Sequence, residues 1–185
     1  NTRNTVLILM IVLAAAFRLL SYKYPYVLSN FTPVGAIALF GGTYFTDKWK
    51  AYLVPLLALF LSDIALNYLY SSKWELLTRD SLWVYLAFAI IVFVGSLIKK
   101  ANVLNVFLAS IVAVAIHWLV PELPWLNGNL YPHTLTGYMQ SLAAAIPFER
   151  NMLLGDIVFC AVLFGGFELA KSKYSTLRSN REFAV

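Results

Sequence analysis

The sequence predicts an all-α polytopic membrane protein with six transmembrane helices and one short interfacial or re-entrant helix. Hydrophobic residues make up 61% of the 185 residues and charged residues 12%, against about 45–50% and about 25% in soluble domains. The mean hydropathy of +0.73 agrees with this difference. The composition excludes a soluble enzyme, a disordered chain and a nucleic-acid-binding domain, and it makes the lipid bilayer the expected surroundings.

Six apolar stretches are long enough, or nearly so, to cross the hydrocarbon core, which requires about 20 residues per helix. They cover residues 6–20, 27–45, 51–70, 81–98, 103–120 and 151–170. A seventh stretch, residues 135–146, is too short to cross, so we expect it to form the interfacial or re-entrant helix before the sixth span. Residues 1–185 are then one transmembrane domain, and residues 171–185 form a basic tail.

The positive charges predict the orientation of these spans. With the N-terminus in the cytoplasm, nine of the 14 Lys and Arg residues fall in cytoplasmic segments and five on the opposite side. Because Lys and Arg accumulate in cytoplasmic loops, we expect both termini in the cytoplasm. The nine are Arg3, Lys48, Lys50, Lys99, Lys100, Lys171, Lys173, Arg178 and Arg181, and the five are Arg18, Lys23, Lys73, Arg79 and Arg150.

The second span has an unusual beginning, in which residues 29–33 read Ser-Asn-Phe-Thr-Pro. Thr32 is a good N-cap and Pro33 suits a first helical turn, so the pair predicts a helix that starts below the outer interface. Non-helical backbone at this depth requires a covered or wet pocket. The exposed helix N-terminus suits an anionic group or the carboxylate of Asp63.

Small residues predict where helices approach one another closely, as they do in other membrane proteins. The second span carries several of them, with Ala38 and Gly42 four residues apart, and Gly165-Gly166 lies in the sixth span. We expect both groups to serve helix packing.

Three ionisable residues stand out inside the predicted spans, because each costs at least about 2.5–3.5 kcal/mol on insertion scales. They are Asp63, His117 and Asp156 in the third, fifth and sixth spans. The predicted topology places all three in the outer half of the membrane, where we expect them to surround one pocket. With their polar neighbours they form the candidate ligand-binding set Thr32, Asp63, Asn67, His117, Arg150 and Asp156.

Structural roles are the alternative for the same residues. Asp63 can pair with Arg150 or bond to the backbone at Thr32 and Pro33, and Asp156 can hold helices together. His117 can be an interfacial histidine with its own partner, and Cys160 can be a small buried hydrophobic residue.

Enzyme motifs are absent from the sequence. There is no Ser/His/Asp set, metal-ligand cluster or glycine-rich phosphate loop, so we expect neither catalysis nor a metal site, and no cofactor is identified. The single cysteine, Cys160, cannot form an intrachain disulfide.

Several stretches resemble a family of uncharacterised bacterial membrane proteins of similar length. They are residues 30–42 (NFTPVGAIALFGG), 61–63 (LSD), 131–137 (YPHTLTG), 145–156 (AIPFERNMLLGD) and 163–165 (LFG). The resembled pattern has Thr-Asn where this chain has Ile116-His117, and an aromatic residue at Glu149. The resemblance implies a place in the bacterial cytoplasmic membrane and no established activity.

The predicted architecture is also similar to that of the substrate-binding components of energy-coupling-factor vitamin transporters. The likeness implies an outward-facing pocket covered by the loops after the first, third and fifth spans, here residues 21–30, 71–80 and 121–150. Our leading hypothesis is therefore a binding or uptake protein for a vitamin-like small molecule, with cationic or hydrogen-bond-donating solutes preferred. The alternative is an accessory structural subunit of a larger membrane complex, in which partner membrane subunits cover the Ala and Gly faces.

Overall fold

A computed structural model describes residues 1–78, 80–123 and 128–179 of the chain. Over these residues the protein is all helical and contains no strand, which confirms the all-α part of the predicted fold class. Arg79, Arg181 and residues 180–185 of the predicted tail lie outside the described part of the chain.

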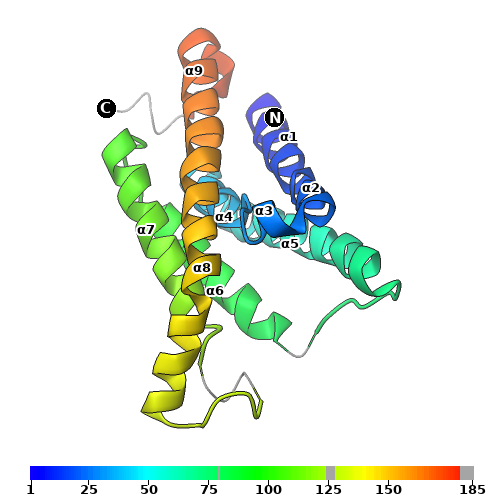
Figure 1. Ribbon diagram of the computed structural model, residues 1–185. Coiled ribbons are helices and arrows are strands. Elements are labelled where there is room, and N and C mark those ends of the chain that lie inside the picture. Colours follow the sequence, from blue (N-terminus) through cyan, green and yellow to red (C-terminus); the bar gives the residue numbers. More distant parts are fainter. Residues whose placement is uncertain (79, 124–127, 180–185) are drawn as a thin grey trace.

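The helices follow one another along the chain, and the longest stretch between two of them is residues 120–134, between α7 and α8. Their bounds are α1 (Thr2–Ala16), α2 (Arg18–Lys23), α3 (Pro25–Leu28), α4 (Val34–Tyr44), α5 (Lys48–Ser71), α6 (Ser81–Ser96), α7 (Val103–Leu119), α8 (Leu135–Cys160), a π-helical turn (Ala161–Gly165), α9 (Gly166–Lys173) and a 3₁₀ turn (Ser175–Leu177). Figure 1 shows α7, α8 and α9 on one side of the molecule and α1, α2 and α5 on the other.

Three helical segments are long and apolar enough to cross a membrane: Thr2–Lys23, Lys48–Ser71 and Leu135–Lys173. The other apolar helices α4, α6 and α7 are shorter, with 11, 16 and 17 residues. At about 1.5 Å per residue, α6 and α7 measure roughly 24–26 Å and α4 only about 16 Å. The structure thus supports a membrane protein. Judged by helix length, three of the six expected crossings have a helix that is long enough.

The prediction of a separate, short interfacial or re-entrant helix at residues 135–146 is wrong. These residues are the first turns of α8, which runs through the π-helical turn into α9 as one segment of 39 residues. Pro147 lies inside α8 and does not end it. At roughly 58 Å, the segment is about twice the thickness of the hydrocarbon core. It also removes residues 135–150 from the loop that the sequence expects after the fifth span.

The predicted span at residues 27–45 is not one helix either. Residues 29–33 form a non-helical break between α3 and α4, and Pro33 rather than Thr32 occupies the N-cap position. The Thr32 side chain therefore accepts no capping hydrogen bond. A residue elsewhere in the fold supplies an acceptor for the backbone at the α4 N-terminus.

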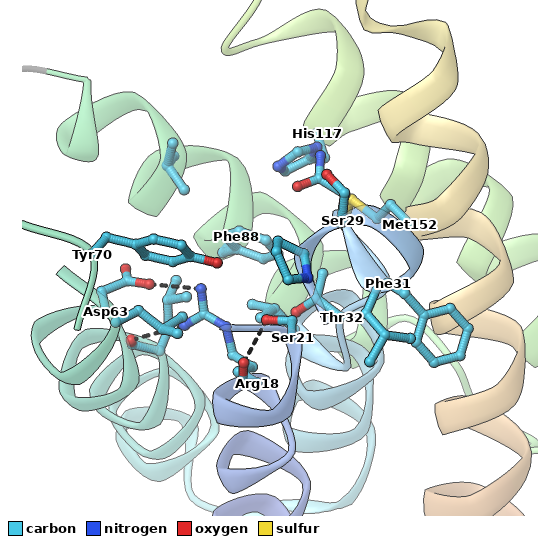
Figure 2. A pocket seen from close by; sticks show the side chains of 17 residues that line it. Arg18, Ser21, Ser29, Phe31, Thr32, Asp63, Tyr70, Phe88, His117 and Met152 are labelled. Atoms are coloured by element: carbon cyan, nitrogen blue, oxygen red, sulfur yellow. Dashed lines mark hydrogen bonds and ion pairs between the residues drawn. The ribbon is translucent and has the colours of Figure 1, made fainter. Parts of the chain in front are cut away.

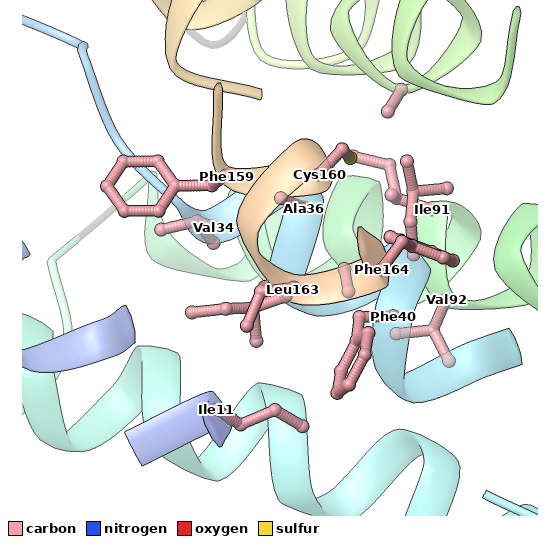
Figure 3. Close-up of a cluster of buried hydrophobic side chains, with 14 of the residues drawn as sticks. Ile11, Val34, Ala36, Phe40, Ile91, Val92, Phe159, Cys160, Leu163 and Phe164 are labelled. Atoms are coloured by element: carbon pink, nitrogen blue, oxygen red, sulfur yellow. The ribbon is translucent and has the colours of Figure 1, made fainter. Parts of the chain in front are cut away.

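The core surrounds α4, whose residues are buried except for the half-buried Thr43. Its close partner is α6, because a Cβ atom added at Gly42 would fall on the Val92 carbonyl oxygen and one at Gly95 on the Leu39 carbonyl oxygen. Figure 3 shows the opposite contact, in which Phe40 of α4 faces Phe164 of the π-helical turn. Helix α4, the unbroken part of the second predicted span, thus lies at the centre of the molecule.

Several helix ends meet at one face of the molecule, which we call the terminus face. The Arg3 guanidinium near the start of α1 donates hydrogen bonds to the Leu177 carbonyl and, at 2.9 Å, to the Tyr44 carbonyl. Thr43 Oγ1 donates to the Gly95 carbonyl at 2.9 Å, which joins the ends of α4 and α6. The start of α1 and the end of the 3₁₀ turn after α9 therefore lie on the same side.

Candidate functional site

A cavity of about 290 Å³ lies beside the break that precedes α4. Its walls come from α2, α3, the break, α5 and α6, with single residues from α4, α7 and α8. Figure 2 shows polar side chains from several of these elements turned toward one space. Of the six residues that the sequence selects, three line this cavity: Thr32, Asp63 and His117.

An ion pair forms one wall of the cavity. Arg18 Nη2 lies 2.7 Å from Asp63 Oδ1, and Arg18 also donates to Ser62 Oγ and to the Leu59 carbonyl. Tyr85 donates its hydroxyl to the other carboxylate oxygen of Asp63 at 2.7 Å. Asp63 is thus held by two partners, and its cation is Arg18 rather than the Arg150 considered from the sequence.

His117 stands on another wall, where it contacts a buried carboxylate. Its Nδ1 lies 3.0 Å from Glu149 Oε1 and 3.3 Å from Oε2. Glu149 is 7% exposed and does not itself line the cavity. His117 and Glu149 are two of the positions at which the chain departs from the resembled pattern, and the structure places their side chains in contact.

Thr32 contributes a polar atom with no partner. Its Oγ1 is buried and makes no hydrogen bond among the described residues, although the residue lines the cavity. Leaving a buried hydroxyl unsatisfied costs free energy, so such atoms in proteins call for an explanation. Here a bound solute or water in the cavity can supply the missing hydrogen bond.

Asp156 has a different place from the one expected. It is fully buried on α8, and its Oδ1 accepts a hydrogen bond from the Ala36 backbone N–H at 3.0 Å. A Cβ atom at Gly35 would fall on this carboxylate, so glycine there makes the contact sterically feasible. Asp156 therefore satisfies the first turn of α4 and does not line the cavity. The acceptor at this helix N-terminus comes from Asp156 and not from Asp63.

Asn67 and Arg150 also lie away from the cavity wall. Asn67 is half-buried on α5, and its Nδ2 donates to the Glu75 carbonyl at 3.1 Å, which fixes the turn after the helix. Arg150 is exposed on α8. The structure thus brings Asp63 and His117 to one cavity and separates Asp156, Asn67 and Arg150 from it.

Sequence reasoning missed Arg18, Tyr85 and Glu149. Arg18 carried a signal, because it is a charged residue within an apolar stretch, and the same cost that singled out Asp63 applies to it. Tyr85 carried none, since tyrosines are common in such helices, and the one signal at Glu149 is its departure from the aromatic residue of the resembled pattern.

The cavity wall combines balanced charge with aromatic surface. Arg18 and Asp63 neutralise each other, while Phe31, Tyr70 and Phe88 add flat apolar faces. Such walls hold a small ring compound by apolar contact and orient it through a few polar groups. The volume is at the small end of the range of about 300–1,000 Å³ for ligand sites.

The chain belongs to a family of unknown function, DUF6580, whose model matches residues 1–177. No curated protein and no solved structure matches the chain.

Proposed function

We propose that this member of the DUF6580 family binds a small, vitamin-like polar solute in the cavity beside α4 and serves its uptake across the bacterial cytoplasmic membrane. The observation that carries the proposal is the unpartnered, buried Thr32 hydroxyl on the wall of a cavity that also holds Asp63 and His117. Polar groups gathered inside an apolar helical bundle are expensive, and in membrane proteins they mark substrate pathways.

The broken helix supports a transport role. Discontinuous helices in transporters present backbone groups to a solute near the middle of the membrane. In this chain residues 29–33 are such a break, and Ser29, Asn30, Phe31 and Thr32 all line the cavity. Because Asp156 already occupies the α4 N-terminus, we do not assign an anionic solute to that helix end. A solute with hydrogen-bond donors, neutral or cationic, fits the remaining acceptors better.

Six crossings are part of the proposal. Residues 25–44 would cross as a broken helix, and α6 and α7 would cross with the help of flanking residues. The even number agrees with the meeting of α1 and the 3₁₀ turn at the terminus face. With both termini in the cytoplasm, the cavity opens toward the outer half of the membrane.

The test is ligand-dependent thermal stabilisation of the purified protein, screened with a panel of water-soluble vitamins. A vitamin that raises the midpoint of unfolding should do so less, or not at all, in Asp63→Asn. The matched control is Asp47→Asn, which makes the same change at the other end of α5, where Asp47 pairs with Lys50 at the surface. The control should keep the full stabilisation.

Two results would overturn the proposal. One is a vitamin shift that Asp63→Asn leaves unchanged, which removes Asp63 from the site. The other is a native mass measurement, after gentle solubilisation, that finds the chain only in a stable heteromeric assembly with no bound solute. That result would favour the accessory-subunit alternative.

A further inference from the structure

A second and larger space lies on the other side of the molecule, between the start of α7 and the end of the long α8–α9 segment. This apolar groove has a volume of about 680 Å³. Its lining residues are Ala101, Asn102, Val103, Val106, Phe107, Ser110, Ile157, Cys160, Ala161, Phe164, Gly165, Glu168, Leu169 and Ser172. None of them belongs to the cavity beside α4.

The groove exists because α7 and α9 diverge. Figure 1 shows α7 crossing α8 and then separating from α9 toward the terminus face. The π-helical turn falls at this point, and its Gly165 has no atom within 4 Å of an added Cβ. The sequence expects Gly165 to pack against a neighbouring helix, and the structure leaves it facing open space instead.

Polarity changes along the groove. At its deep end Ser110 Oγ and Cys160 Sγ, 3.3 Å apart, satisfy each other and leave apolar walls around them. At the terminus face the lining residues are Asn102, Glu168 and Ser172. The Glu168 carboxylate accepts from Tyr44 at 2.5 Å and pairs with Lys171 at 2.9 Å, so its charge is neutralised by the protein.

Basic residues frame the polar end. Lys99 and Lys100 precede the first lining residue, Ala101, and Lys173 follows the last, Ser172. All three are exposed. The groove is therefore apolar except at this end, where exposed lysines stand next to its lining residues in the chain. This arrangement complements an anionic phospholipid with its acyl chain inside and its headgroup outside.

We propose that this groove binds one acyl chain of an anionic phospholipid, whose phosphate lies against Lys100 and Lys173. Two of the apolar lining residues are exposed at the surface of the molecule, since Val103 is 88% exposed and Leu169 67%. An apolar groove that opens onto the hydrocarbon core is filled from the bilayer, and the lysines select the anionic headgroup. A partner helix would bury the apolar walls equally well, but it would leave these lysines without a counter-charge.

The test uses native mass spectrometry of the detergent-purified chain titrated with phosphatidylglycerol or phosphatidylcholine. The wild-type chain should bind the first phosphatidylglycerol at least about tenfold more tightly than phosphatidylcholine. Gly165→Phe fills the groove and should remove this preferred binding. The matched control is Val162→Phe, which adds the same ring at a 59% exposed position of the same turn, off the groove wall. It should bind as the wild type does.

The charge contribution is tested with Lys100→Gln/Lys173→Gln. This double variant should lose most of the preference for phosphatidylglycerol, whereas Lys48→Gln/Lys50→Gln, with equal charge removed elsewhere, should keep it. If Gly165→Phe does not fold, Ala161→Phe replaces it, because Ala161 also lines the groove from an exposed position. Equal binding of the two lipids by the wild type would overturn the proposal. So would full binding by the filled variants, or displacement of lipid by a second copy of the chain.

Discussion

At the scale of single residues, Asp156 is the clearest case of an ionisable group with a structural role. It caps a helix that it does not belong to, by accepting from the Ala36 N–H. We expect Asp156→Ala to lower the free energy of unfolding by about 1–3 kcal/mol, because a buried donor loses its acceptor. Asp156→Asn keeps an acceptor oxygen and should lose less. Thermal unfolding in detergent measures both, and equal losses would show that the charge, not the acceptor, matters.

For Thr32 we predict the opposite effect on the free energy of unfolding. Thr32→Val has nearly the same shape and removes the unpartnered hydroxyl. The empty protein should therefore be as stable as the wild type or up to about 1 kcal/mol more stable. If a solute completes the hydrogen bond, the same variant should bind it more weakly. Unfolding midpoints with and without the vitamin found for the wild type separate the two effects, and a large loss of stability without ligand would contradict our view of Thr32.

At the scale of elements, the contact of α4 with α6 depends on two glycines. A Cβ at Gly95 would fall on the Leu39 backbone, which cannot move aside without shifting α4. Gly95→Ala should lower stability by roughly 1–3 kcal/mol, the range for overpacked cores. Gly165→Ala is the control, because its Cβ meets nothing and alanine favours the helix. Urea or thermal unfolding of the two variants gives the comparison, and similar midpoints would contradict the packing.

The elements also show where sequence reasoning reached its limit. Hydropathy finds α1, α5 and the end of α8 correctly, because a long apolar helix needs no tertiary information. The sequence analysis ends one helix at residue 146 and begins the next at residue 151, yet α8 continues through Pro147. Proline costs a helix one backbone hydrogen bond, and the packing of α8 against α7 and α4 outweighs this cost. The sequence predicts the break at residues 29–33. It does not predict that Asp156 accepts from the first turn of α4, because Asp156 lies 120 positions after Ala36 in the chain.

At the scale of the whole molecule, the same limit applies to the site. The insertion cost of a charge predicts that Asp63, His117 and Asp156 need partners, and each has one. It does not tell which partner, because pairing depends on the rotation of each helix about its axis. Asp63 and His117 consequently share a cavity, while Asp156 turns toward α4.

The number of crossings can be decided by the position of the chain ends. Arg3 bonds to the Leu177 carbonyl, so the two ends of the described fold lie together. If all six apolar segments cross, both termini are on one side of the membrane, and the nine-to-five distribution of positive charge makes it the cytoplasm. If only the three long helices cross, the termini are on opposite sides. Fluorescent-protein and alkaline-phosphatase fusions at each end should therefore both report the cytoplasm, and an insertion between Ser72 and Glu75 should report the outside. Termini on opposite sides would reduce the count to an odd number and would move the cavity beside α4 out of the pathway that uptake requires.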